Sequence, residues 1–417
     1  MGDFCLACHS LAVVRLWREK GNQASIHRIP IPVLTGKTGC LEPNGVFEFL
    51  TPSSFLRNVP CMNLAHIRLR SQIIKLIRRF FDEQDFLEVH TPRLVGTPGQ
   101  EPYLEPFWTQ VIESNGTAHP AALITSPEYM CKRLLAAGIE KLYDLGPCFR
   151  NNEPFDGTHD PEFLMLEWYR RDAELVDLMD DTEALIKFVA SSVIPSEAAA
   201  QSRELRGSLN SVTTPFETTK IPEMLNQPFR RLTVEQAWRE YAGIELAPLL
   251  DNRQAMAEIC LAHNQSVSPD DTWDDLYFKI FLSEIEPKLG LVQPTFLYRY
   301  PKSMAALARL SKDNARWADR VELYIGKLEL ANGFAELSDE AEQRFRFEQE
   351  RKLRAALGKN TWPLDERFLS ALPQMGNAAG IAFGVDRLVM LLLGTDSIND
   401  VVLASARERF DQVTPKE

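Results

Sequence analysis

Two strand-like segments with a polar loop between them constrain the fold of this chain more than any other feature. Residues 142–149 and 163–170 both have the apolar and aromatic residues of buried strands, and the loop that joins them contains glycine and charged side chains. Helical patterns flank these and the other strand-like segments. We therefore expect an α+β fold in which helices flank an antiparallel sheet.

The helical pattern is clearest over residues 66–81. Ile73 and Ile77 fall on one face of this helix, opposite Arg70 and Arg78. Further helices are predicted over residues 177–190, 233–241, 271–289 and 339–357. Further strands are predicted over residues 86–89, 321–325, 328–331 and 380–385, the last one leading into a final helix.

One more helix, over residues 127–137, has a recognisable start. Ser126 is a residue type that caps helices through its hydroxyl, and Pro127 suits the first helical position because it has no N–H to leave unpaired. We therefore predict Ser126 as the N-cap.

The domain organisation follows from patterning. Residues 1–61 mix Pro and Gly with short apolar runs, so we interpret them as a poorly patterned extension and residues 62–417 as one domain. Residues 191–228 have little periodicity and are interpreted as a loop or insertion. The pattern Cys5-Leu6-Ala7-Cys8-His9 matches c-type haem attachment, but neither export nor a haem pocket is visible, and no fourth ligand follows at zinc-finger spacing.

Composition argues against several classes of protein. No stretch approaches the roughly 18 apolar residues of a membrane-spanning helix, and the seven cysteines are odd in number and scattered. We therefore expect a cytoplasmic protein with no membrane partner. The formal net charge is −12, and no basic block is interleaved with aromatic residues, so binding of nucleic acid, including tRNA, is disfavoured.

The strongest chemical signal is the loop between the two central strands. Arg150 ends the first strand, and a planar, permanently charged guanidinium suits phosphate oxygens. His159 and Phe163 follow across the loop, and Glu167 and Tyr169 alternate along the second strand. The alternative is a surface hairpin with solvated charges.

A second signal is a pair of acidic strands. Glu322 and Glu329 lie on the two arms of a predicted hairpin that turns near Gly326-Lys327, where two carboxylates could hold Mg²⁺ between protein and nucleotide. Glu336 follows and could bind a substrate ammonium. The alternative is three unrelated acidic residues in a chain that has 58 of them.

A third signal is the segment from Gly380 to Leu388. Its small residues allow close approach of a ligand to the strand. Arg387 falls at a helix start, where a cation opposes the helix dipole, and such a placement is tolerable if the guanidinium faces phosphates. A glycine-rich strand packed against a helix is the alternative.

Together, these motifs resemble motifs 2 and 3 and the intervening acidic segment of the class II aminoacyl-tRNA synthetases, most closely the lysyl branch. The shared residues are Arg-Asn followed by His-x-Pro-Glu-Phe, then Glu-x-x-Asn-Gly-Phe-x-Glu-Leu, then Gly-x-Asp-Arg-Leu. Residues 86–94, with Pro92, are similar to motif 1, which implies a homodimer. The resemblance covers about residues 62–410 and implies a catalytic domain of that class.

Within this branch the chain looks most like the truncated paralogues that ligate (R)-β-lysine to a lysine of elongation factor P. The 61 residues before the domain are too few and too unpatterned for an anticodon-binding domain. Ala382 stands where the synthetases usually have Gly and the paralogues have Ala. The resemblance leaves two alternatives: an enzyme that charges tRNA with lysine without an anticodon domain, and a non-catalytic regulator that binds an amino acid.

The resemblance also implies roles for individual residues. Arg150 would bind the α-phosphate and the reacting carboxylate, and Arg387 the γ-phosphate of ATP. Mg²⁺ would be held by Glu322 and Glu329. The substrate amino acid, (R)-β-lysine or lysine, would be held by Ser126, Pro127, Glu128, Glu167, Tyr169, Glu336 and Ala382. The remaining ATP contacts would come from Asn151, Asn152, Glu153, His159, Asp160, Phe163, Leu330, Asn332 and Gly384.

The chain departs from the family pattern at two places. The family usually has Arg-Asn-Glu, whereas Asn152 takes the third position here and Glu153 follows. A one-residue slip would let Glu153 supply the acidic contact. Asp160 replaces the usual Asn, which changes the contact expected on the adenine side.

Overall fold

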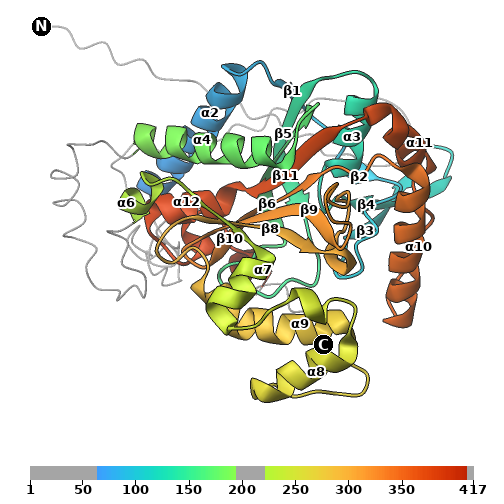
Figure 1. The fold of residues 1–417 in the computed structure, drawn as a ribbon. Coiled ribbons are helices and arrows are strands. Elements are labelled where there is room, and N and C mark those ends of the chain that lie inside the picture. Colours follow the sequence, from blue (N-terminus) through green and yellow to red (C-terminus); the bar gives the residue numbers. More distant parts are fainter. Residues whose placement is uncertain (1–62, 194–220, 411–417) are drawn as a thin grey trace, which may run out of the picture. The chain divides into compact units, whose positions relative to one another are not determined.

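The computed structural model describes residues 63–193 and 221–410, and Figure 1 shows their arrangement. The predictions for residues 1–61, for the Cys5–His9 pattern and for most of the 191–228 segment lie outside the described residues. The described end of that segment is a short helix, α6 (Ile221–Leu225), which the sequence analysis took as loop. None of the described helices is long and apolar enough to cross a membrane.

An eight-stranded sheet, with strands in the order β1-β5-β6-β11-β10-β9-β8-β7, forms the centre (Figure 1). The strands are β1 (Leu87–Val89), β5 (Lys141–Phe149), β6 (Glu162–Arg171), β7 (Arg230–Thr233), β8 (Thr295–Pro301), β9 (Trp317–Ile325), β10 (Leu328–Ala335) and β11 (Ala378–Gly384). Only the outermost pairs, β1 with β5 and β7 with β8, are parallel. The predicted fold class is therefore confirmed.

Helices cover both faces of this sheet. The helices α2 (Leu64–Asp82), α4 (Leu175–Val193) and α12 (Val385–Leu393) pack together on one face. The helices α3 (Glu128–Ala136), α10 (Glu340–Ala356) and α11 (Glu366–Met375) pack near the other. A small second sheet, β2 (Leu94–Val95), β3 (Trp108–Ile112) and β4 (Ala118–Leu123), lies outside the main one.

Alternation along the strands separates the core from a polar face. On β6, Leu166 and Trp168 point into the largest hydrophobic cluster, which also holds Ile73 and Ile77 of α2. Their neighbours Glu167 and Tyr169 necessarily point the other way. The predicted amphipathic helix over 66–81 is thus confirmed, and its apolar face helps to turn the polar strand residues toward the opposite side.

The start of α3 differs from its prediction. The helix begins at Glu128 with Pro127 as its N-cap, one residue later than expected, and it has no capping hydrogen bond from a side chain at that position. Ser126 lies before the cap, where its Oγ accepts a long, 3.5 Å bond from the N–H of Glu128. The identification of Ser126 as the N-cap was wrong because Pro127, with φ −82° and ψ 2°, is not yet helical.

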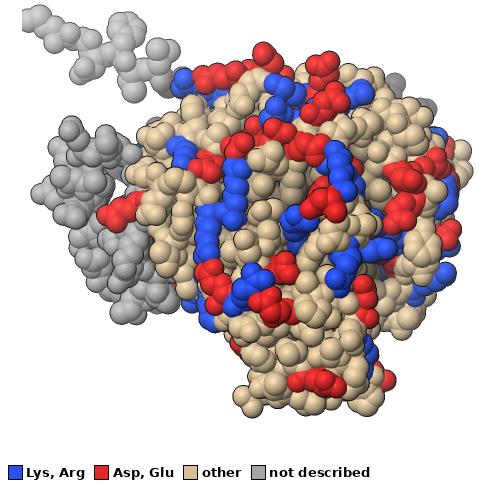
Figure 2. Space-filling model, viewed as in Figure 1, with Lys and Arg blue, Asp and Glu red and all other residues tan. Residues whose placement is uncertain are grey.

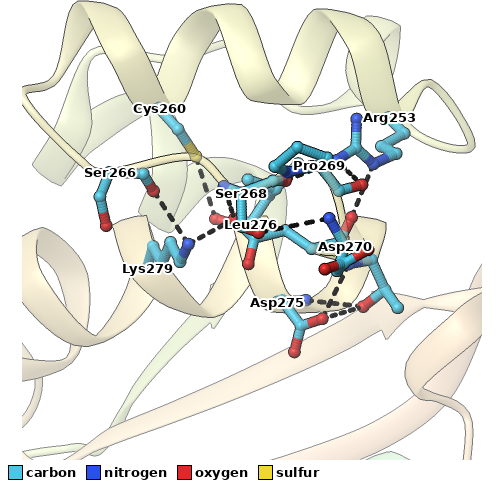
Figure 3. A network of polar contacts seen from close by, with 11 residues as sticks. Arg253, Cys260, Ser266, Ser268, Pro269, Asp270, Asp275, Leu276 and Lys279 are labelled. Carbon is cyan, nitrogen blue, oxygen red and sulfur yellow. Dashed lines mark hydrogen bonds and ion pairs between the residues drawn. The ribbon is translucent and has the colours of Figure 1, made fainter.

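Residues 234–289 form a helical segment with its own hydrophobic cluster. It contains α7 (Val234–Ala237), α8 (Arg253–Ala262) and α9 (Trp273–Ile280), with π-helical turns after α7 and α9. Figure 3 shows how polar contacts hold the loop between α8 and α9: Arg253 donates to the carbonyls of Ser268, Pro269 and Asp271, and Lys279 donates to that of Ser266. The network fixes the loop within the segment, while the hydrophobic cluster of the segment continues onto Leu297 of β8 and Tyr324 of β9.

Candidate active site

A cavity of about 340 Å³ opens on the polar face of the sheet, above β6, β11, β10 and β9. The sequence-predicted residues that line it are Arg150, Glu153, His159, Asp160, Phe163, Glu322, Glu329, Leu330, Asn332, Ala382, Gly384 and Arg387. They come from segments far apart in sequence because alternate residues of the neighbouring strands share one face: Glu167, Ala382 and Asn332 are in register across β6, β11 and β10.

Arg150 stands at the end of β5, where its backbone N–H donates to the carbonyl of Pro161 across the loop. Its guanidinium lies over the ring of Phe163, with 5.1 Å from Cζ to the ring centroid. Its buried Nε has no hydrogen-bond partner among the described residues. The side chain is thus positioned by packing, and its donors remain available to an anion.

Arg387 is held by an irregularity in the neighbouring hairpin. The β9–β10 register shifts between Glu329 and Ala331, a β-bulge in which Leu330 is the extra residue. The Glu329 carbonyl accepts a 2.6 Å hydrogen bond from Nη1 of Arg387, and Nη2 lies 3.3 Å from Nε2 of His159. The guanidinium therefore faces the cavity from the first turn of α12, as predicted.

The hairpin formed by β9 and β10 brings two carboxylates to this cavity, as predicted. Glu322 is 6% exposed, and its oxygens accept from the hydroxyls of Tyr300 and Tyr324 and from Arg320, at 2.5–2.6 Å. Burial and repulsion from Glu322 raise the pKa of Glu329 to about 7, although three arginines oppose the shift. The three arginines thus do not fully offset burial and the repulsion from Glu322.

This pair of carboxylates fits a magnesium ion only in combination with a nucleotide. Within the described residues, no group of three or more His, Cys, Asp or Glu side chains could hold a metal by itself. Magnesium in nucleotide sites is commonly bound by one or two carboxylates together with phosphate oxygens and water. A cation at this place would also relieve the repulsion between Glu322 and Glu329.

A second group of titratable side chains lies deeper on the same face, around Lys132. Its Nζ lies 2.5 Å from Glu128, one turn earlier on α3, and 2.6 Å from Glu336, just after β10. All three residues are buried, at 2%, 7% and 2% exposed respectively. Burial opposes the charge of Lys132, but the two carboxylates outweigh it and raise its pKa above the usual value.

Glu336 is left without a full counter-charge. Burial raises its pKa to about 8; Lys132 lowers it and repulsion from Glu128 raises it. Its Oε1 accepts no hydrogen bond from the described residues. An unpartnered, buried carboxylate oxygen is costly, and a bound ammonium would satisfy it.

Glu167 and Tyr169 complete this deeper group. The Tyr169 hydroxyl donates to Oε1 of Glu167, while Oε2 has no partner within the described part of the chain. Burial, with repulsion from Glu128, raises the pKa of Glu167 well above its ordinary range. Gly380 on the adjacent strand leaves the room that the Tyr169 ring occupies, since a Cβ there would overlap the ring. We call Glu128, Lys132, Glu167, Tyr169 and Glu336 the ammonium pocket.

The remaining predicted residues lie elsewhere. Ser126 and Pro127 line a different cavity of about 480 Å³ beside β2 and the start of α11. Asn151 and Asn152 are exposed and do not line the 340 Å³ cavity, whereas Glu153 does. Asn152 has a left-handed backbone with φ 61°, so the extra residue is accommodated at this position and Glu153 takes the inward place.

Asp160 is fully engaged by the protein itself. Its oxygens accept from Arg409 on α13 (Ala406–Phe410) and from the backbone N–H groups of Glu162 and Ala406. The contact with Arg409 is an ion pair, which an uncharged Asn at this position could not form. The Asp-for-Asn departure therefore ties the loop to the last described helix.

Two residues near the site were missed from the sequence. Lys132 was not singled out, although its position four residues after Glu128 in a predicted helix was a usable signal. Arg354 on α10 is 0% exposed and donates to the carbonyls of Glu101 and Leu104 at 2.9 and 2.8 Å. Since Leu104 lines the 340 Å³ cavity, Arg354 holds one wall of it.

Comparison with known proteins identifies close relatives. A sequence family described as class II tRNA synthetases (D, K and N) matches residues 53–406. The elongation factor P–(R)-β-lysine ligase of Proteus mirabilis is 36% identical over 347 residues, which is 82% of this chain and 95% of the relative. The proteins of that name from Photorhabdus laumondii and Sodalis glossinidius are 37% and 36% identical, over 83% and 84% of this chain and 96% and 97% of their own.

Proposed function

Because the chain belongs to the class II tRNA synthetases of the D, K and N group, we propose that it activates (R)-β-lysine with ATP and transfers it to a lysine side chain of elongation factor P. The observation that carries the substrate class is the ammonium pocket. Two buried carboxylates, Glu128 and Glu336, share Lys132, and a third, that of Glu167, is buried on the same face of the sheet. Glu167 and Glu336 have oxygens without a hydrogen-bond partner among the described residues. Such a pocket suits an amino acid with two ammonium groups.

The first step joins the amino acid to AMP. The substrate carboxylate attacks the α-phosphorus of ATP, the bond to the bridging oxygen breaks, and pyrophosphate leaves. Arg150 neutralises the charge that gathers on the α-phosphate, Arg387 binds the terminal phosphate, and Phe163 offers an aromatic surface to the adenine. Mg²⁺ at Glu322 and Glu329 would supply further charge neutralisation on the phosphates.

The second step transfers the activated acid. The uncharged amine of the acceptor lysine attacks the carbonyl carbon of the acyl-adenylate, an amide bond forms, and AMP leaves. No nucleophile of this chain is needed, so catalysis rests on positioning and charge. The relatives' name specifies elongation factor P as the acceptor, and we propose the same acceptor in the cytoplasm.

Two finer points belong to the proposal. We propose a homodimer through the Pro92 region, where Leu87 and Leu94 are exposed at 53% and 43%. We also propose that residues 62–417 form the catalytic domain. On the face drawn in Figure 2, acidic and basic side chains are interspersed. This face therefore offers no continuous basic surface for the phosphates of tRNA.

ATP–pyrophosphate exchange with (R)-β-lysine, (S)-β-lysine and L-lysine in parallel tests the proposal. Elongation factor P and tRNA are then added and their masses measured. We expect the strongest exchange with (R)-β-lysine and a mass gain on the protein alone. Preference for L-lysine with charged tRNA would make the enzyme a tRNA synthetase without an anticodon domain, and no exchange with any of them would favour a non-catalytic regulator.

A further inference from the structure

The ammonium pocket already contains one ammonium group, that of Lys132. Lys132 belongs to α3, and its Nζ lies between Glu128 and Glu336. Its side chain is 1% exposed. A lysine four residues after a glutamate is ordinary on a helix surface. Here the pair of Glu128 and Lys132 is buried, and Lys132 also contacts Glu336, which is distant in the sequence. An ion pair on the protein surface rarely has such an additional buried partner.

Lys132 changes what the pocket demands of a ligand. Glu128, Glu167 and Glu336 carry three potential negative charges, and Lys132 compensates one of them. A buried carboxylate without a counter-ion is strongly unfavourable, because the mutual attraction of the ion pair is what offsets the loss of water. Burial raises the pKa of Glu167 and of Glu336, and a ligand that pairs with both carboxylates in place of their protons must supply two positive charges.

A diamino acid supplies that number, and its carboxylate is left to meet Arg150. A monoamino acid of the same length would leave one carboxylate buried and unpaired. Without Lys132, even a diamino acid would fall one charge short. The lysine therefore matches the charge of the pocket to the charge of the substrate.

We propose that Lys132 is a positioning residue whose fixed ammonium sets the number of positive charges that the pocket accepts, and so selects diamino acids over monoamino acids. This inference rests on the proposed function, since it takes the pocket to be the amino-acid site.

The test is a charge series of four proteins: wild type, Lys132→Met, Glu336→Gln, and the double variant. Met has nearly the length of Lys, so the volume of the side chain is kept. In the complex with the amino acid, where Glu336 has lost its proton, removing Lys132 adds one uncompensated negative charge and Glu336→Gln removes one. The double variant therefore restores the charge balance of the wild type with different residues.

The probe is ATP–pyrophosphate exchange with the diamino acid that wild type uses best. We expect Lys132→Met alone to raise KM for this amino acid at least tenfold with a smaller change in kcat, because Lys132 lies away from the reacting carboxylate. Glu336→Gln alone should also raise KM. In the Glu336→Gln protein, adding Lys132→Met should lower KM again.

A purely structural role predicts a different result. Lys132→Met would then be equally harmful in both backgrounds, and additive effects on KM would overturn the proposal. Lys187→Met is the matched control, since Lys187 forms a 2.6 Å pair with Glu183 at the same helical spacing but is partly exposed. It should leave KM unchanged.

Monoamino acids give an independent reading. 3-Aminohexanoic acid has the skeleton of β-lysine without the distal ammonium, and norleucine is the counterpart of L-lysine. We expect Glu336→Gln to narrow the preference of wild type for the diamino acid over this analogue. An unchanged preference would contradict charge matching.

The outcomes separate the inference from the proposed function. If wild type exchanges with no diamino acid, the proposed function fails. The charge series is then measured by the rise in melting temperature that each diamino acid causes, which still decides whether Lys132 sets the charge requirement. If Lys132→Met does not fold, Glu336→Gln and the double variant give the decisive comparison.

Discussion

The 340 Å³ cavity, which we propose binds ATP and call the nucleotide cavity, lies on the same face of the sheet as the ammonium pocket, yet the two are prepared for their ligands in different ways. In the cavity, Arg387 and Glu322 already have partners within the protein, a backbone carbonyl for one and two tyrosine hydroxyls and an arginine for the other. In the pocket, Glu167 and Glu336 have unpartnered oxygens within the described residues. Arg387 and Glu322 are therefore held in place before a nucleotide binds, although the Nε of Arg150 has no partner among the described residues, whereas these two glutamates of the pocket gain full partners only when an amino acid binds.

The difference separates two tasks. A site whose side chains are held in place stabilises a transition state without reorganisation. A site with unsatisfied buried charge discriminates strongly, because the wrong ligand leaves that charge unpaired. Changes in the cavity should therefore act on the chemical step, and changes in the pocket on amino-acid binding.

The largest effect is expected from Arg150→Ala. If the guanidinium of Arg150 meets the α-phosphate and the reacting carboxylate as proposed, its loss should reduce the exchange rate by roughly 1,000-fold and also raise KM for the amino acid. The measurement is ATP–pyrophosphate exchange, with the melting temperature as a check of folding. Arg367→Ala, at an exposed position on α11, is the control. An unchanged exchange rate in Arg150→Ala would refute the site assignment.

The next effect is expected from Glu329→Gln. If Glu329 helps to hold Mg²⁺, the variant should lose about 100-fold in kcat/KM for ATP and need more Mg²⁺ for half-maximal rate. A magnesium titration of exchange measures both, and chelation of the metal should abolish exchange in wild type. Glu258→Gln on exposed α8 serves as the matched change. A normal magnesium requirement in Glu329→Gln would place the metal elsewhere.

A pH dependence should distinguish the pocket from the cavity. With a pKa of about 8, Glu336 holds a proton at pH 7 and must lose it to pair with an ammonium. KM for the amino acid should therefore fall by up to about tenfold per unit as pH rises from 6 toward 8, and then level off.

Calorimetry checks this linkage directly. Binding at pH 7 should release a proton, which is measured by titrating the amino acid in two buffers of different ionisation enthalpy. Glu336→Gln should remove that part of the proton release. A KM independent of pH would show that Glu336 is already ionised in the free protein.

The smallest effect is expected at the boundary between the two regions. Ala382 is in register with Glu167 on one side and Asn332 on the other. Ala382→Gly should shift the ratio of kcat/KM for (R)-β-lysine and L-lysine by about tenfold toward L-lysine, since one methyl group is worth about 1–3 kcal/mol. Competition between the two amino acids in exchange measures the ratio, and no shift would remove Ala382 from the specificity determinants.

Most of the central strands were predictable because a few consecutive residues of each strand show which side chains are buried and which face the polar side. The alternation along β6 and the acidic arms of the β9–β10 hairpin are local patterns, and both were confirmed with longer bounds than predicted. Of the described elements, five strands (β2, β3, β4, β7 and β8) and four helices (α6, α8, α11 and α13) were missed. β7 was missed because it begins with two arginines, which are not typical of a buried strand. α11 was missed because it contains Pro373, a residue that usually ends a helix.

The site was predictable only where a motif carried it. The cavity residues Arg150, Glu322, Glu329 and Arg387 were named from the sequence and lie together. The role of Lys132 depends on Glu336, which is 204 residues later in the chain, and no local pattern could link them. The hydrogen bond from Arg409 to Asp160 likewise joins segments 249 residues apart, so no local pattern could indicate it.

The buried Arg354 also bears on when the enzyme becomes active during its synthesis. It satisfies carbonyls of a segment that lies 253 residues earlier, at Glu101. A ribosome adds residues one at a time, and early segments emerge long before α10. One wall of the nucleotide cavity therefore cannot close on a nascent chain until α10 has left the ribosome, so a released fragment that stops short of Arg354 would contain Arg150 and Glu329 but no finished site.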